Sequence, residues 1–161
     1  MQSILDRILT INLVGTTVVF YAAVRLYLIP RLGVLTTRSV LLPILLLHSL
    51  RHLGLMFLTR GATYEGMPQE FAWPAAMGDL LTSVLAFCSI PAVAGGWRSA
   101  RLLVWIFNIV GTLDLISAIT LATVYQAQAY MGPSYWIPAF WVPSLLVTHY
   151  VTFIVLRRPW K

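Results

Sequence analysis

Five apolar runs, each of about twenty residues, divide the chain and leave only short polar connections between them. The hydrocarbon core of a bilayer is about 30 Å thick, and an α-helix needs roughly 20 apolar residues to cross it. Lipid offers backbone polar groups no partners, so each run must satisfy its own backbone as a helix. We therefore expect an all-α fold with five transmembrane helices, over residues 8–29, 39–59, 71–94, 102–125 and 136–156.

The composition agrees with one transmembrane domain over residues 1–161. Hydrophobic residues make up 59% of the chain, charged residues only 10%, and the mean hydropathy is +0.82. Soluble domains are about 45–50% apolar and about 25% charged. The first run exceeds the apolar part of a typical secretory signal, so we expect a span there rather than a cleaved leader. No connection reaches the roughly 50 residues of a soluble domain, so function must lie in the bundle or at its two ends.

Basic residues alternate between the ends of the runs and predict the orientation. One side would carry Arg25, Arg31, Arg38, Arg98, Arg101, Arg157, Arg158 and Lys161, and the other Asp6, Arg7, Arg60, Glu65 and Glu70. The positive-inside rule then places the N-terminus outside and the C-terminus in the cytoplasm, as expected for a protein of the cell's inner (plasma) membrane. The net charge of +6 is thereby explained by orientation and by contact with lipid head groups, and we expect no nucleic-acid partner.

Four ionisable residues interrupt the apolar runs, and they are the main candidates for a functional site. They are Arg51 and His52 in the second span, Asp79 in the third and Asp114 in the fourth. A charge at the bilayer centre costs about 2.5–3.5 kcal/mol or more, so such residues are usually paired and functional. A rise of 1.5 Å per residue puts all four at nearly one depth, about 18 Å from the cytoplasmic ends of their helices.

Spacing along each helix suggests a shared interior face for this layer. His48, Arg51 and His52 follow the spacing of one face of an α-helix. The residues expected to support the layer are polar and small: Asn12, Thr82, Ser83 and Ser117. One arginine and two aspartates leave one negative charge, which a proton can neutralise, so the layer would suit a proton relay or an ionisable ligand.

The remaining histidines offer a different site. His48 and His149 fall at a similar lower depth, about 11–13 Å from the cytoplasmic end, and two imidazoles from different spans can ligate a b-type haem. A metal held by His48 and His52 with Asp79 is another possibility, because residues four apart share a helix face. Neither pattern is specific, and hydrogen-bonded core histidines satisfy both spacings.

The sequence lacks the signature motifs of several enzyme classes. The chain has no Gly-rich phosphate loop, no Gly-x-Ser-x-Gly elbow and a single cysteine, Cys88, so we expect no catalytic residues. The leading hypothesis is a small inner-membrane protein whose buried layer binds a small ligand or conducts protons or solute. Five spans are few for alternating access, so a transporter would form a homodimer. The alternatives are a haem-binding redox protein and a non-catalytic subunit of a larger membrane complex.

Overall fold

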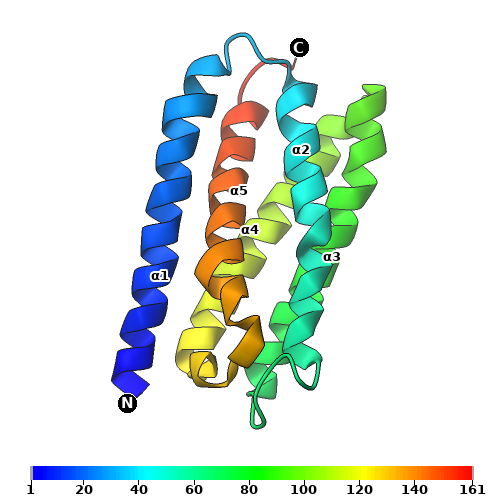
Figure 1. Cartoon of the computed structure of the whole chain (residues 1–161). Coiled ribbons are helices and arrows are strands. Elements are labelled where there is room, and N and C mark those ends of the chain that lie inside the picture. Colours follow the sequence, from blue (N-terminus) through cyan, green and yellow to red (C-terminus); the bar gives the residue numbers. More distant parts are fainter. Residues whose placement is uncertain (1, 161) are drawn as a thin grey trace.

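The computed structural model describes residues 2–160, and residues 2, 3, 5 and 6 by their backbone alone. The predictions for Lys161 and for the side chain of Asp6 therefore lie outside the described residues. Five helices alternate in direction and form one bundle, with the described chain ends at opposite ends of it (Figure 1). The main helices are α1 (Gln2–Ala23), α2 (Thr37–Ser49), α3 (Gln69–Gly95), α4 (Ala100–Val124) and α5 (Val142–Leu156).

Short stretches of other helical winding extend three of these helices. A π-helical turn (Val24–Leu28) and a 3₁₀ turn (Ile29–Arg31) follow α1, and a 3₁₀ segment (Leu50–Leu58) continues α2. Two 3₁₀ turns (Ala127–Tyr130 and Gly132–Tyr135) and a π-helical turn (Ile137–Trp141) precede α5. Five continuous helical stretches are long and apolar enough to cross a membrane: Arg7–Arg31, Thr37–Leu58, Gln69–Gly95, Ala100–Val124 and Gly132–Leu156. The all-helical fold with five such helices is confirmed.

Local signals explain where individual helices begin and end. The Thr36 side chain caps α2 by accepting a hydrogen bond from the backbone N–H of Ser39 at 3.2 Å, which satisfies a donor that the first helical turn leaves free. Gly96 ends α3 in the left-handed region, with φ +66°, where glycine has no steric cost. Pro138 lies in the π-helical turn Ile137–Trp141 and Pro143 in the first turn of α5, so the irregular winding lies where backbone N–H groups are missing.

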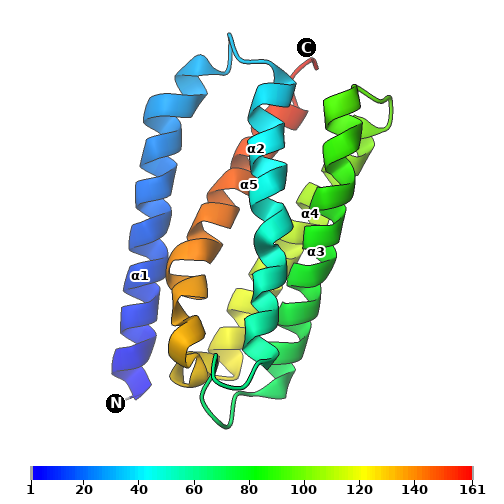
Figure 2. The ribbon, with the colours of Figure 1, turned by 45° about the vertical axis from the view of Figure 1, so that its right-hand side comes forward.

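α1 stands at the edge of the bundle beside α5, whereas α3 packs between α2 and α4 (Figures 1 and 2). No residue in the most apolar window of the first span is buried. The contacts of α1 are made by side chains: the Asn12 amide donates to the Tyr135 hydroxyl at 3.2 Å, and Phe20 meets Phe140 edge-on. The interior is therefore built mainly by the other four helices.

Two apolar clusters fill that interior, one toward each end. The cluster near the C-terminus of the chain includes Leu41, Leu45, Val104, Phe107 and Val151. The cluster near the N-terminus includes Phe57, Phe71, Leu115, Met131 and Ile137. The layer between them holds the buried polar residues of the candidate site.

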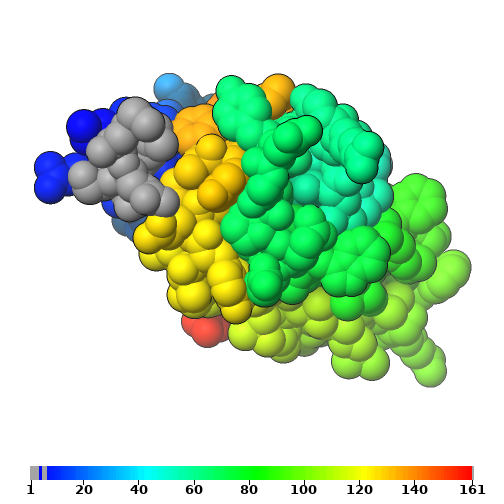
Figure 3. Space-filling model, turned by 90° about the horizontal axis from the view of Figure 1, so that it is seen from below, coloured from blue at the N-terminus to red at the C-terminus, as the bar shows by residue number. Residues whose placement is uncertain are grey.

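The end of the bundle that holds the N-terminus is closed by two segments that lie side by side. The connection between α2 and α3 meets the turns before α5 through two backbone hydrogen bonds, from Tyr64 N to Tyr130 O and from Ser134 N to Ala62 O, both 2.9 Å long. Figure 3 looks onto this end and shows the two segments covering it.

Candidate functional site

The 3₁₀ segment Leu50–Leu58 turns every third residue inward. Arg51, Gly54 and Phe57 are its buried members, as expected for winding at three residues per turn, where residues i and i+3 lie above one another. Arg51 is only 1% exposed. Such a buried guanidinium must be paired, because an isolated charge in an apolar interior costs several kcal/mol.

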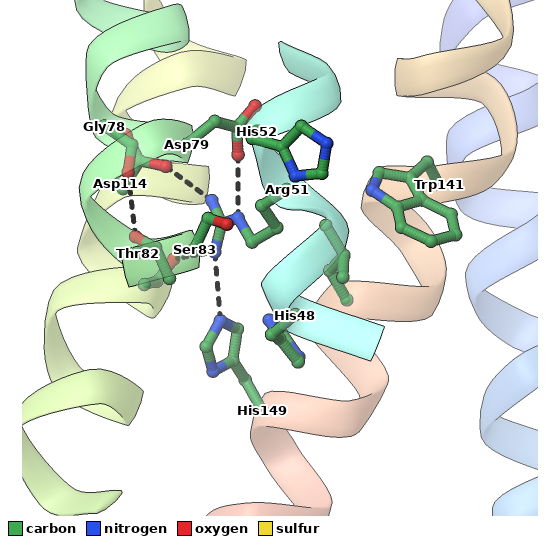
Figure 4. A network of polar contacts seen from close by, with 12 residues as sticks. His48, Arg51, His52, Gly78, Asp79, Thr82, Ser83, Asp114, Trp141 and His149 are labelled. Carbon is green, nitrogen blue, oxygen red and sulfur yellow. Dashed lines mark hydrogen bonds and ion pairs between the residues drawn. The ribbon is translucent and has the colours of Figure 1, made fainter. Parts of the chain in front are cut away.

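The guanidinium of Arg51 holds both aspartates. Nε donates to Asp79 Oδ1 at 2.7 Å and Nη2 donates to Asp114 Oδ2 at 2.5 Å (Figure 4). Nη1 donates to the backbone carbonyl of Gly111 at 3.2 Å and lies 3.3 Å from His149 Nε2. One positive side chain thus joins three other helices, and with both carboxylates ionised the formal charge of Arg51, Asp79 and Asp114 together is minus one.

The histidine beside Arg51 has a defined tautomer. Arginine offers only donors, so His149 Nε2 must accept, and His149 Nδ1 carries the proton and donates to Asn108 Oδ1 at 2.7 Å. Asn108 is fully buried, and its amide nitrogen lies 3.4 Å from the backbone carbonyl of His149. We call Arg51, Asp79, Asp114, His149 and Asn108 the Arg51 network.

His48 extends the polar region toward α5. His48 Nε2 lies 2.9 Å from the Thr148 hydroxyl, which is also within hydrogen-bond distance of the backbone carbonyls of Ser144 and Leu145 in its own helix. His48 Nδ1 is buried without a hydrogen-bond partner among the described residues. The rings of His48 and His149 lie 4.3 Å apart between centroids.

Three glycines make room for these side chains. A Cβ at Gly54 would overlap the carboxylate of Asp79, and one at Gly78 would overlap that of Asp114. A Cβ at Gly111 would come within 2.6 Å of both His149 Cε1 and Thr82 Cγ2. Glycines on three different helices therefore let the backbones approach closely enough for the ion pairs to form.

Two hydroxyls on α3 support the network from outside. The Ser83 hydroxyl donates to the backbone carbonyl of Ser49 at 2.5 Å, next to the start of the 3₁₀ segment. The Thr82 hydroxyl donates to Gly78 O at 2.9 Å, within its own helix. Both side chains are buried, so the structure places these two predicted supporting residues at the site.

Three other predicted residues lie elsewhere. His52 is exposed and donates through Nδ1 to Ser49 O at 3.0 Å, away from both aspartates. The expectation assumed α-helical spacing, whereas the 3₁₀ winding rotates residue i+4 off the face of residue i. Ser117 is exposed on α4. Asn12 bonds to Tyr135 instead of reaching the network.

The geometry does not fit a b-type haem between His48 and His149. Axial ligands approach iron from opposite faces of a macrocycle, yet these two rings touch each other with an interplanar angle of 55°. Phe107 packs on both, at 5.0 Å from His48 and 5.3 Å from His149 between centroids. Within the described part of the chain, no three His, Cys, Asp or Glu residues gather in a way that fits a metal ion, and His48, His52 and Asp79 are not gathered so.

A comparison with protein-family models supplies the family. The model described as "Domain of unknown function (DUF8737)" matches residues 8–157.

The chain belongs to the DUF8737 family.

The region matched by the DUF8737 model contains every residue of the Arg51 network. No curated protein and no solved structure matches the chain. The family assignment therefore adds no chemistry of its own, and the function must be argued from the site.

Residues that the sequence analysis did not select complete the site. Asn108 fixes the His149 tautomer, and Gly54, Gly78 and Gly111 give the space for the charged groups. Asn108 could have been selected by its depth. It lies about 9 Å from the start of the fourth span, close to the depth estimated for His149. The glycines carry no such signal, because their role depends on which helices face each other.

Proposed function

We propose that the chain is a multi-pass protein of the cell's inner (plasma) membrane in which the Arg51 network binds one proton or small monovalent cation and couples it to transport. The orientation has the N-terminus outside and the C-terminus in the cytoplasm. This orientation is supported by the arginines near one end of the bundle: Arg25, Arg31, Arg38, Arg98, Arg101, Arg157 and Arg158. Glu65, in the connection between α2 and α3, and Glu70, in the first turn of α3, fall at the opposite end.

The observation that carries the proposal is the charge imbalance around Arg51. One guanidinium contacts two carboxylates, and a net charge in a low-dielectric interior is costly. Binding one proton or one cation removes the imbalance, and releasing it restores the imbalance. A site that has two charge states of this kind can couple ion binding to a change in helix packing.

The neighbouring histidines support the same role. His149 contacts Arg51, and the ring of His48 lies against that of His149. The Nδ1 atom of His48 is buried in the bundle without a hydrogen-bond partner among the described residues. Apolar clusters lie on both sides of this polar layer, toward the two ends of the bundle. A chain with five spans would complete alternating access as a homodimer.

The test is proton entry into proteoliposomes that contain the purified chain and a pH-sensitive dye, driven by an imposed membrane potential. We expect entry above that of empty vesicles, and its loss in Asp79→Asn and in Asp114→Asn. Ser117→Ala changes an exposed residue on α4 and is the matched control.

Two results would overturn the transport proposal: no proton entry with the unmodified chain, or full entry in both asparagine variants. Copurification with a larger complex, together with asparagine variants that stay folded but lose that association, would support the assembly-subunit hypothesis instead.

A further inference from the structure

Two cavities lie in the half of the bundle that holds the N-terminus. The larger one, which we call the N-terminal hollow, has a volume of about 670 Å³ and is lined by residues 57–61, 63–67, 69 and 73. Arg60, Tyr64 and Glu65 of its lining are exposed, so the hollow opens at the surface of the molecule. The smaller one, which we call the inner cavity, has a volume of about 40 Å³ and is enclosed by α3, α4, the 3₁₀ segment and residues 131–142.

Phe57 is the one residue that lines both cavities. Its side chain is buried, and its ring meets the ring of Phe71 edge-on, with centroids 5.1 Å apart and an interplanar angle of 68°. Phe71 is also buried and lines the inner cavity. The ring of Phe57 therefore stands between the hollow and the inner cavity.

The inner cavity leads from Phe57 to the Arg51 network. Asp79 lines it and, among the described residues of that lining, is the one with a polar side chain. The Asp79 side chain is 13% exposed, and its Oδ1 accepts a hydrogen bond from Arg51 Nε. A route from the surface to the network thus crosses the N-terminal hollow, the ring of Phe57 and the inner cavity, in that order.

The 3₁₀ winding explains why the ring lies on this route. Phe57 follows Arg51 by two 3₁₀ turns, so both side chains are on the inward face of the segment Leu50–Leu58. The same face that carries the guanidinium to its two carboxylates therefore also carries the ring that covers them from the N-terminal side.

Size and polarity keep the route dry while the ring is in place. A water molecule needs roughly 10–15 Å³ of such space and several polar partners. The inner cavity has space for very few water molecules, and its walls are apolar apart from Asp79. Apolar constrictions of this kind stop water and ions by dewetting, and they conduct once they are widened.

We propose that Phe57 is the gate between the N-terminal end of the bundle and Asp79. With the ring in place the route is closed, and displacement of the ring lets water and protons reach the carboxylate. The inference rests on the proposed function, because it gives the path by which the Arg51 network would exchange protons. It goes beyond that proposal by naming the side of access and the residue that controls it.

The test is the labelling rate of a cysteine in the inner cavity, measured with a small water-soluble methanethiosulfonate reagent on the purified full-length chain in detergent. Cys88 is first replaced by serine, because it is exposed and would react. Ala75 lines the inner cavity but not the hollow, and it is buried, so Ala75→Cys reports access. Since cysteine labelling depends on access, we expect slow labelling with Phe57 present and labelling at least about tenfold faster in Phe57→Ala.

Two other cysteine positions are the controls. Ala92→Cys lies on the same helix, buried in the other apolar cluster, and should label equally slowly with and without Phe57. Gln69→Cys lies at the hollow and is exposed, so it should label fast in both. Phe57→Leu keeps an apolar side chain and should give an intermediate rate at Ala75→Cys, which protects the test against misfolding of the alanine variant. Equal labelling of Ala75→Cys by all variants at position 57, or a parallel rise at Ala92→Cys, would overturn the gate.

Proton entry separates this inference from the transport proposal. In proteoliposomes, Phe57→Ala should raise the rate of proton entry, and Asp79→Asn in the same chain should abolish it. The expected labelling without any proton entry would support the route and reject the transport proposal. Proton entry by the unmodified chain, together with labelling that ignores Phe57, would reject the gate alone.

Discussion

Replacing Gly78 by alanine tests whether close helix approach is what allows the ion pairs of Arg51 to form. The added Cβ would overlap the Asp114 carboxylate, and that carboxylate lies between α3 and the guanidinium. Asp114 must then move away, and its 2.5 Å contact with Arg51 Nη2 is lost. The substitution removes no polar group, so any loss of stability comes from displacement.

The expected loss of stability follows from two opposing contributions. Breaking a buried ion pair while leaving one partner behind costs about 3–5 kcal/mol. Alanine in a helix interior is favoured over glycine by about 1 kcal/mol. The net destabilisation is therefore about 2–4 kcal/mol, and at about 2–4 °C per kcal/mol for a chain of this size the melting temperature should fall by about 4–16 °C.

Thermal unfolding in detergent, followed by the fluorescence of the six tryptophans, measures this shift. Gly15→Ala is the matched control, because a Cβ at Gly15 has no atom within 4 Å, and its melting temperature should stay the same or rise slightly. In an Asp114→Ala background, Gly78→Ala should no longer destabilise, since the displaced group is gone. If Gly78→Ala and Gly15→Ala have the same melting temperature, a Cβ at position 78 does not displace Asp114.

Two further predictions concern the residues around Arg51. His52→Ala should change the free energy of unfolding by less than about 0.5 kcal/mol because His52 is exposed. His149→Ala should lower it by at least about 2 kcal/mol because the buried Asn108 side chain loses its hydrogen-bond partner. Equal melting temperatures of the two variants would contradict an exposed His52 and a buried His149. Arg51→Lys should reduce both stability and proton entry, since a lysine lacks the planar guanidinium that reaches Asp79 and Asp114 together. A lysine variant that matches the unmodified chain in both assays would show that the guanidinium is not required.

The helices were predictable because length and apolarity act locally. Each of the five expected ranges overlaps a helix that is long and apolar enough to cross a membrane, and the ends differ by a few residues. The π-helical turn before α5 also has a local cause, since it contains Pro138, whose missing N–H disturbs a helix wherever it lies. These features need no knowledge of which helices are neighbours.

The site was only partly predictable, because it depends on winding and on neighbours. Depth along the helices was sufficient to group Arg51, Asp79 and Asp114, which the structure brings into contact. The same reasoning grouped His48 with His149, and their rings do meet. It failed for His52, because α-helical spacing was assumed where the chain is wound as a 3₁₀ helix.

The 3₁₀ segment Leu50–Leu58 also sets a length. Its nine residues extend about 18 Å, whereas the same residues in an α-helix would extend only about 13–14 Å. Rewinding it would shorten the segment by about 4–5 Å and turn its far end by about half a revolution. The connection that follows is held to the turns before α5 by the Tyr64–Tyr130 and Ala62–Ser134 hydrogen bonds. These bonds therefore oppose any shortening of the 3₁₀ segment.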